Sequence, residues 1–251
     1  MSKRFIVDSK NIKKVDNNIS IFGDEAHHIN VLRYRVKDRV YINEYEVEIT
    51  DMDKEYVSGV IVGSLEEKGV PNTNVTLVQA YLKSDKMEYV TQKAVELGAK
   101  EILPVLSKNC VVKLDEKDKL KKVERLNKIA KEAVEQCGRT DEVEVLDVEN
   151  LLKVDYSRFD AVLVCHEAVT NSLKEAIKGI KEFNNIAVIV GPEGGLDEKE
   201  VEELLKNKNA YVVSLGERVL RAETASFSIL SILWYEFSLI ISSSHIILYI
   251  M

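Results

Sequence analysis

From Val75 onward, continuous apolar runs alternate with longer amphipathic stretches, and few folds accommodate such a sequence. The runs 161–165 and 186–190 are apolar throughout, which is typical of parallel strands covered on both faces. Residues 86–98 have apolar side chains at helical spacing and end in Gly98, where a helix is expected to stop. Alternation of this kind predicts an α/β fold with a mainly parallel sheet.

The same pattern predicts the individual elements. We expect strands at residues 75–82, 101–106, 161–165, 186–190 and 211–215. We expect helices at residues 86–98, 119–137 and 224–237, and a further helix that starts near Asp197.

The first seventy residues have a different character. Short runs with a period of two, broken by Asp, Asn and Gly, predict a small antiparallel β domain. Residues 68–74 are rich in turn formers and are the best linker candidate. We therefore expect a β domain at 1–70, an α/β domain at 75–237 and an atypical apolar tail at 238–251. The tail is too short to span a bilayer alone and Glu236 interrupts a longer span, so a buried, partner-covered or abnormal end is favoured over a membrane anchor.

Composition excludes some classes of protein. The chain has 42 acidic and 35 basic residues, a net charge of -7, so it is not basic overall, although a local basic patch is allowed. Its three cysteines are widely spaced and form no Cys-x-x-Cys motif, which argues against a thiolate zinc site and a disulfide framework. The N-terminus does not resemble a signal peptide, and we expect a reducing, cytoplasmic location.

Two glycine-bearing loops are the main candidates for a binding site. In residues 189–200 a predicted strand runs into Gly-Pro-Glu-Gly-Gly and then into a helix, which Asp197 and Glu200 cap. Glycines allow close approach of the backbone to a ligand, and the carboxyl end of a strand is the usual ligand edge of such a sheet. A tight turn before a helix is the structural alternative.

The second loop, residues 214–225, repeats this arrangement with Arg218, Arg221, Glu223 and Thr224 crowded together. A salt-bridged helix start explains it equally well when it is taken alone. However, two such loops at strand ends are expected to lie side by side and to frame one pocket.

Basic residues form two further candidates. Arg139 follows the helix-stopping Gly138 and is either a functional loop residue or an ordinary surface arginine. Residues 33–39 carry alternating cations which, in a strand, would share one face and suit a phosphate backbone, although a solvated face is equally compatible. The pair His27-His28 is weak evidence for a metal, and we expect none.

Several motifs, taken in order, resemble one known family. They are His28 through Arg33, Leu82 through Met87, Gln92 through Gly98, Glu132 through Arg139, Gly191 through Gly195, and Leu215 through Ala225. Together they are similar to the bacterial 16S rRNA (uracil-N3)-methyltransferases of the RsmE type, in the SPOUT superfamily, over residues 1–237.

This resemblance implies a fold and an activity. The N-terminal domain would be a PUA-like β barrel that helps to hold RNA, and the second domain would be a trefoil-knotted α/β methyltransferase domain. The knot loops would bind S-adenosylmethionine, the chain would form a homodimer, and the product would be N3-methyluridine in the small ribosomal subunit. A knotted methyltransferase for another rRNA or tRNA site, and a catalytically silent RNA-binding module, are the alternatives.

The resemblance also suggests roles for particular residues. The cofactor-binding candidates are Gly191, Glu193, Gly194, Gly195, Leu196, Leu215, Gly216, Val219 and Leu220. The catalytic candidates are Arg139 or Arg221, which would stabilise the uracil oxygens, and Glu223 or Glu167, which would take the N3 proton. The RNA-binding candidates are Arg33, Arg35, Lys83, Lys86 and Lys93.

Some positions depart from the family pattern. Lys37-Asp38 stands where the family often has Gly-Asp, and the proline that usually follows the Gly-Arg motif is missing after Arg139. Asn109 occupies a position that is often arginine in the family, so one RNA or substrate contact of the family is not expected to be conserved in this chain.

Overall fold

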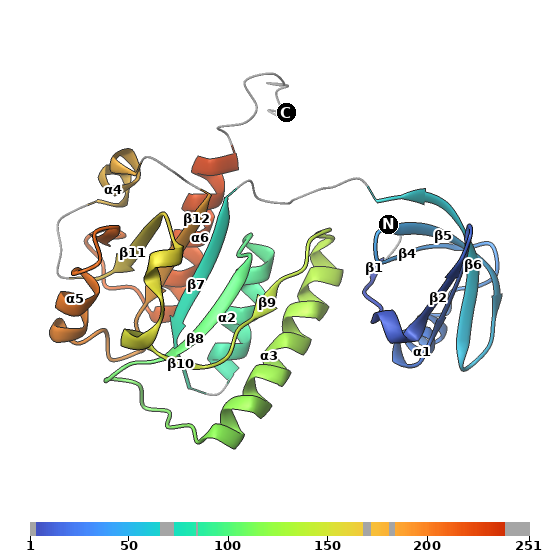
Figure 1. Cartoon of the computed structure of the whole chain (residues 1–251), viewed down its shortest axis with the longest axis horizontal. Coiled ribbons are helices and arrows are strands. Elements are labelled where there is room, and N and C mark those ends of the chain that lie inside the picture. Colours follow the sequence, from blue (N-terminus) through green and yellow to red (C-terminus); the bar gives the residue numbers. More distant parts are fainter. Residues whose placement is uncertain (1–3, 66–72, 84, 168–171, 181–183, 239–251) are drawn as a thin grey trace. The chain divides into compact units, whose positions relative to one another are not determined.

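The computed structural model describes residues 4–65, 73–83, 85–167, 172–180 and 184–238 (Figure 1). The chain divides into two compact units. Met1–Val70 and Val134–Glu142 form unit 1, and Pro71–Ala133 and Val143–Met251 form unit 2. The C-terminal end of one long helix is therefore part of unit 1, although most of that helix belongs to unit 2.

Unit 1 is built on a six-stranded sheet in the order β1-β4-β5-β6-β3-β2. Its elements are β1 (Arg4–Phe5), η1 (Ser9–Asn11), β2 (Ile12–Val15), β3 (Asn18–Phe22), α1 (Asp24–Val31), β4 (Arg39–Ile42), β5 (Tyr45–Met52) and β6 (Tyr56–Ser64). The pairs are antiparallel except for β1 with β4. Alternate residues such as Ile19, Ile21, Val47 and Ile49 point into one buried core, as period-two strands require.

The basic stretch of unit 1 does not have the strand geometry in which its cations would share a face. Helix α1 has Asp24 and Glu25 in its first turn, which favours a helix start, and the chain then turns with positive φ at Arg33 (63°) and Lys37 (78°). Of the alternating cations, only Arg39 lies in a strand, at the start of β4.

Unit 2 contains the expected α/β arrangement. Its strands pair in parallel in the order β10-β8-β7-β12-β11-β13, with β9 also beside β8. They are β7 (Asn74–Ala80), β8 (Glu101–Leu106), β9 (Glu144–Val145), β10 (Glu149–Asn150), β11 (Ala161–Cys165), β12 (Asn185–Val190) and β13 (Ala210–Val213). The five predicted strands are confirmed, with ends that differ by at most two residues.

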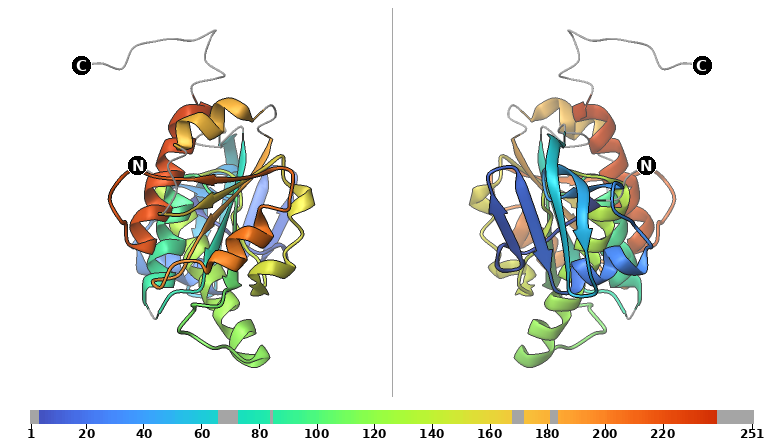
Figure 2. Two further views of the ribbon diagram at one scale, coloured as in Figure 1. Left: turned by 90° about the vertical axis from the view of Figure 1, so that its left-hand side faces the viewer. Right: turned by 90° about the vertical axis from the view of Figure 1, so that its right-hand side faces the viewer.

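The helices of unit 2 cover both faces of this sheet. They are α2 (Asp85–Glu96), α3 (Glu116–Cys137), α4 (Leu173–Gly179), α5 (Glu198–Leu204) and α6 (Ala222–Ser238), together with the short η2 (Leu151–Lys153) and η3 (Tyr156–Arg158). Helices α2 and α6 pack together on one face, and α6 contacts β7 and β12 (Figure 2). Helix α5 lies against η2 on the opposite face, where Leu204 and Leu151 join a core with Val78 and Ile189.

Local sequence rules explain where several helices begin and end. Asp197 and Glu200 form the expected capping box at the start of α5, and Ser172 and Glu175 form another at α4. Gly98 follows α2 with φ of 90°, a conformation that favours glycine. Each helix in the described ranges is too short or too polar to cross a bilayer. The predicted tail falls, after Ser238, outside the described residues.

Candidate functional site

A cavity of about 530 Å³ opens in unit 2 where three neighbouring parallel strands end. Its wall is formed mostly by residues 165–167 at the end of β11, residues 190–196 at the end of β12, and residues 214–216 and 218–222 after β13. Lys86 at the start of α2 and Ala225 of α6 also line it. Both glycine-bearing loops therefore line one cavity at the carboxyl edge of the sheet, as their positions in the sequence predict.

The first loop folds tightly back on itself. A Cβ atom added at Gly191 would lie 3.0 Å from the backbone nitrogen of Leu196 and 3.1 Å from its Cγ. Gly195 has φ of 72°, which favours glycine. Gly191 lines the cavity, and the absence of a side chain there allows Leu196 to pack against it.

A neighbouring turn holds this loop in place. The side-chain amide of Asn109 donates hydrogen bonds to the carbonyls of Gly194 (3.3 Å) and Gly195 (3.2 Å). Beside it, the Lys108 backbone amide donates to Glu200, and the Lys108 ammonium pairs with Asp197. This pair raises the pKa of Lys108 and lowers the pKa of Asp197. Asn109, which we singled out as a departure from the family pattern, therefore supports the glycine loop.

The second loop begins with a turn in which Ser214 Oγ accepts a hydrogen bond from the Gly216 amide (3.2 Å). Gly216 has φ of 121°, a conformation that favours glycine. Val219 is 76% exposed at the cavity wall. Among the described residues, the Arg218 and Arg221 side chains have no hydrogen-bond or ion-pair partner, so both offer an unpaired cation to the cavity.

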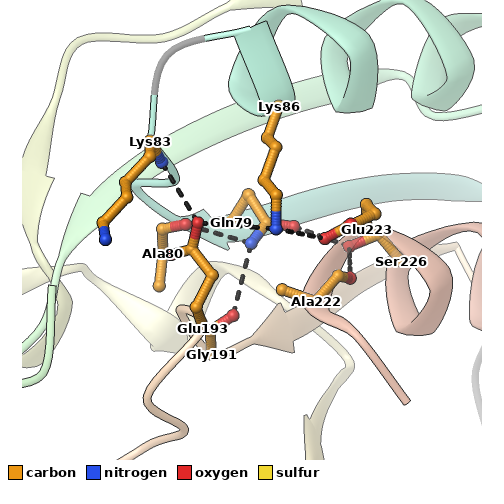
Figure 3. A network of polar contacts seen from close by, with 9 residues as sticks. All are labelled: Gln79, Ala80, Lys83, Lys86, Gly191, Glu193, Ala222, Glu223 and Ser226. Atoms are coloured by element: carbon orange, nitrogen blue, oxygen red, sulfur yellow. Dashed lines mark hydrogen bonds and ion pairs between the residues drawn. The ribbon is translucent and has the colours of Figure 1, made fainter. Parts of the chain in front are cut away.

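Below the cavity, a buried polar network joins the two loops (Figure 3). The Gln79 amide nitrogen donates to the carbonyls of Ala80 (3.0 Å), Val190 (3.4 Å) and Gly191 (3.5 Å). Its oxygen accepts a hydrogen bond from Ser226 of α6 at 2.6 Å. Because both side chains are fully buried, their polar atoms need these partners. We did not predict this role, although Gln79 stands out in the sequence as a polar residue within an apolar run.

Nearer the solvent, charged side chains join the same segments. The Lys86 ammonium lies 3.3 Å from a carboxylate oxygen of Glu223 and 3.8 Å from one of Glu193 (Figure 3). The backbone amide of Lys83 also donates to Glu193, at 3.3 Å. Lys86, a predicted RNA contact, thus lines the cavity. Glu223 does not line it but forms an ion pair with Lys86.

Most of the predicted site residues belong to unit 2. All the cofactor-binding candidates line the cavity, as do Arg221, Glu167 and Lys86. Lys83 is exposed beside it, and Lys93 pairs with Glu96 on α2 at 2.7 Å. Arg33 and Arg35 belong to the turns of unit 1 after α1.

Arg139 belongs to unit 1 and is buried. Its guanidinium donates hydrogen bonds to both carboxylate oxygens of Asp141, at 2.9 and 2.6 Å. The Arg4 guanidinium donates to the backbone carbonyls of Arg139 and Thr140. Desolvation lowers the pKa of Arg4, against the opposing effect of nearby acids led by Asp141. These contacts indicate a structural role for Arg139 in unit 1.

His28 has carboxylate neighbours that the sequence analysis overlooked. Ligand atoms of His28, Glu25 and Glu135 lie within 4.8 Å of one another in unit 1. Glu25 is one helical turn before His28 on α1, whereas Glu135 belongs to α3 and accepts a hydrogen bond from the Ile6 amide. Glu135 thus brings the end of α3 close to α1 and to the residue that follows β1.

Cys165, in the cavity wall, is expected to resist alkylation. Burial raises its pKa to about 12, and the thiolate is the reactive form of a cysteine. With iodoacetamide at neutral pH, mass spectrometry should find the exposed Cys137 modified and Cys165 modified only after denaturant is added. Equal rates at Cys165 and Cys137 in the native protein would contradict this expectation.

Comparisons with known proteins give a consistent result. A family model described as an RNA methyltransferase domain matches residues 70–234. Ribosomal RNA small subunit methyltransferase E of Bacillus subtilis (strain 168) is 32% identical over 96% of this chain and 98% of that protein. The structure of ribosomal RNA small subunit methyltransferase E from Neisseria gonorrhoeae, bound to S-adenosyl methionine, matches with a TM-score of 0.83 at 25% identity, over 94% of this chain and 98% of that chain. A methyltransferase structure from Legionella pneumophila in complex with SAM matches with a TM-score of 0.81 at 27% identity, over 94% and 98% of the two chains.

Proposed function

The chain belongs to the ribosomal RNA small subunit methyltransferase E family, and we propose that it methylates N3 of one uridine in 16S rRNA. It is an S-adenosylmethionine-dependent rRNA methyltransferase. The observation that carries the proposal is the single cavity built by the two glycine-bearing loops, in a fold that matches cofactor-bound relatives. An rRNA substrate supports a cytoplasmic location.

The residues present fit this cofactor. Gly191, Gly194 and Gly195 line the cavity, and Leu196 packs so closely that a side chain at position 191 would collide with it. Leu196 and Val219 supply apolar wall. We propose that S-adenosylmethionine is held by backbone and side-chain contacts from the nine predicted residues, Gly191, Glu193, Gly194, Gly195, Leu196, Leu215, Gly216, Val219 and Leu220.

The proposed chemistry needs few protein groups. The bound cofactor supplies an electrophilic methyl group, so the protein has to align uracil N3 and remove its proton. The unpaired Arg221 guanidinium is suited to stabilise the negative charge on the uracil oxygens. Glu167 lines the cavity and is the more direct proton acceptor, while the Glu223 carboxylate is already engaged by Lys86. The buried Arg139 guanidinium is held by Asp141, so we assign Arg139 a structural role and give the charge stabilisation to Arg221.

We propose that unit 1 is a PUA-like domain that contacts rRNA through Arg33 and Arg35, aided by Lys83 and Lys93 of unit 2. The excess of bases over acids in residues 1–40 supports this, since phosphate contacts dominate RNA affinity. We further propose that unit 2 has the deep trefoil knot of the SPOUT superfamily. Support comes from the strand order, in which β12 inserts between β7 and β11.

A homodimer is also part of the proposal. Thr224, Ser228, Ser231, Ile232 and Tyr235 follow helical spacing along α6 and carry no charge. Ile232 is 39% and Tyr235 64% exposed, so this face leaves two large apolar side chains open to solvent. A second copy of the chain would cover this face.

Tyr235→Asp should therefore raise the dimer dissociation constant by about thirtyfold or more, the loss typical of a central aromatic contact. Sedimentation velocity over a dilution series measures it. Leu205→Asp replaces another exposed apolar residue of unit 2 and serves as the matched control, with the wild-type constant. A Tyr235→Asp protein that dimerises like the wild type would exclude this face.

The enzymatic proposal is tested with purified protein, S-adenosylmethionine carrying a labelled methyl group, and three RNA samples. We expect calorimetry to show cofactor binding and label to enter small ribosomal subunits or 16S rRNA, but not tRNA. Label in tRNA alone would identify a different substrate. Binding of RNA without any cofactor binding would indicate a silent RNA-binding module.

A further inference from the structure

Lys86 lies where three segments distant in the sequence meet. It is on the first turn of α2, and its ammonium contacts Glu193 of the first glycine loop and Glu223 at the start of α6 (Figure 3). The carboxylates are partly buried, with side-chain exposures of 25% and 15%. Sequence alone placed Lys86 among the RNA contacts, but its ammonium pairs with two carboxylates of the cavity region.

We propose that Lys86 is a positioning residue that couples the two cofactor-binding loops, and that its role is not to contact the RNA backbone. This inference rests on the proposed function of the cavity. Glu193 and Glu223 hold the Lys86 ammonium in place, and the ammonium in turn keeps the two carboxylates near each other.

The charges explain why such a residue is needed. The Glu193 and Glu223 carboxylates both lie within 4 Å of the Lys86 nitrogen and repel each other. The positive charge of the Lys86 ammonium offsets this repulsion. Without Lys86, Glu193 keeps only the Lys83 backbone amide as a partner among the described residues and is free to turn toward water. Since Glu193 lines the cavity, its position affects a ligand that carries a positive sulfonium.

A second connection between the loops carries no charge. It allows the effect of Lys86 on the loop positions to be distinguished from an effect on the folding of unit 2. The buried Gln79 bonds to the carbonyl of Gly191 and to Ser226, beneath the Lys86 contacts. This network does not depend on Lys86. Removal of the Lys86 charge should therefore leave unit 2 folded while it displaces the carboxylates at the cavity wall.

The test is Lys86→Met in the full-length protein. We expect the dissociation constant for S-adenosylmethionine, measured by calorimetry, to rise about tenfold, as for the loss of a charged hydrogen bond. RNA affinity should keep the wild-type salt dependence. A phosphate contact would instead lower the slope of log K against log salt by about one, with cofactor affinity unchanged, and that result would overturn the proposal.

Further variants sharpen this test. Lys128→Met is the matched control, because Lys128 is an exposed lysine of α3 in unit 2 that does not line the cavity. Its cofactor affinity should equal that of the wild type. Glu193→Gln alone, and combined with Lys86→Met, completes a double-mutant cycle. If the two residues act together, the combined loss of cofactor affinity should be smaller than the sum of the two single losses. Additive losses would refute the coupling.

The inference and the proposed function fail in different ways. If the wild-type protein does not bind S-adenosylmethionine, the proposed function is wrong. If the wild type binds and Lys86→Met binds equally well, only the role of Lys86 is wrong. Thermal unfolding of each variant identifies a loss of cofactor affinity that comes from unfolding. Lys86→Arg keeps the positive charge and should retain most of the cofactor affinity.

Discussion

Replacement of Gly191 by valine is expected to weaken S-adenosylmethionine binding by about a hundredfold or more. A Cβ atom at this position already lies 3.0 Å from the Leu196 nitrogen and 3.2 Å from the Gly195 carbonyl carbon. Valine adds two methyl groups, so the backbone of the loop has to move away from the conformation that lines the cavity. Overpacking of this kind costs about 1–3 kcal/mol, and displaced backbone contacts to the ligand add to the loss.

Calorimetry with the purified variant measures this effect, and Gly179→Val is its matched control. Gly179 is the last residue of α4, and an added Cβ there meets no atom of the described chain within 4 Å. The control should bind cofactor with the wild-type constant and unfold at a similar temperature. If Gly191→Val retains full affinity, the first glycine loop does not bind the cofactor.

Arg221→Ala is expected to lower kcat about a hundredfold and to leave the cofactor dissociation constant nearly unchanged. Arg221 is exposed at the cavity wall and has no partner among the described residues, so its loss leaves no buried charge unpaired. A single group that stabilises a developing oxyanion contributes about 10²–10³ in rate. Initial rates of methyl transfer to saturating RNA give kcat, and unchanged turnover would exclude Arg221 from the chemistry.

Arg139→Ala is expected to lower the stability of the fold, in contrast to the effect of Arg221→Ala on kcat. The Arg139 and Asp141 side chains are 5% and 11% exposed, so Arg139→Ala removes one member of a nearly buried ion pair. Such a loss costs about 3–5 kcal/mol in folding free energy. We therefore expect Arg139→Ala to lower the denaturant midpoint of unit 1, whereas Arg221→Ala keeps the wild-type midpoint. A fully stable Arg139→Ala protein with reduced kcat would restore Arg139 to the catalytic scheme.

Local rules predicted the parts of the fold that depend on near neighbours in the sequence. The runs 161–165 and 186–190 formed buried parallel strands because every side chain on both faces is apolar. Asp197 capped α5 because its partner Glu200 is three residues away. Helix α1 was missed because its eight residues contain two histidines and little apolar periodicity.

The parts that sequence could not predict depend on contacts between distant residues. Asn109 supports a glycine loop 85 residues further along the chain, and Gln79 reaches Ser226 across 147 residues. Arg139 lies in a loop, as predicted, but the sequence does not show that it is buried or that Arg4, 135 residues earlier, donates to its backbone carbonyl. Lys86 was grouped with RNA contacts because its charge was visible and its two carboxylate partners were not.

Nucleotide-resolved mapping of the methyl group tests the central claim most directly. Small subunits from a strain that lacks the modification are incubated with the protein and labelled S-adenosylmethionine, and the 16S rRNA is then digested and analysed by mass spectrometry. We predict one labelled uridine, with the methyl group on N3. Label on another base or another uracil atom, or none at all while the cofactor still binds, would contradict the proposed reaction.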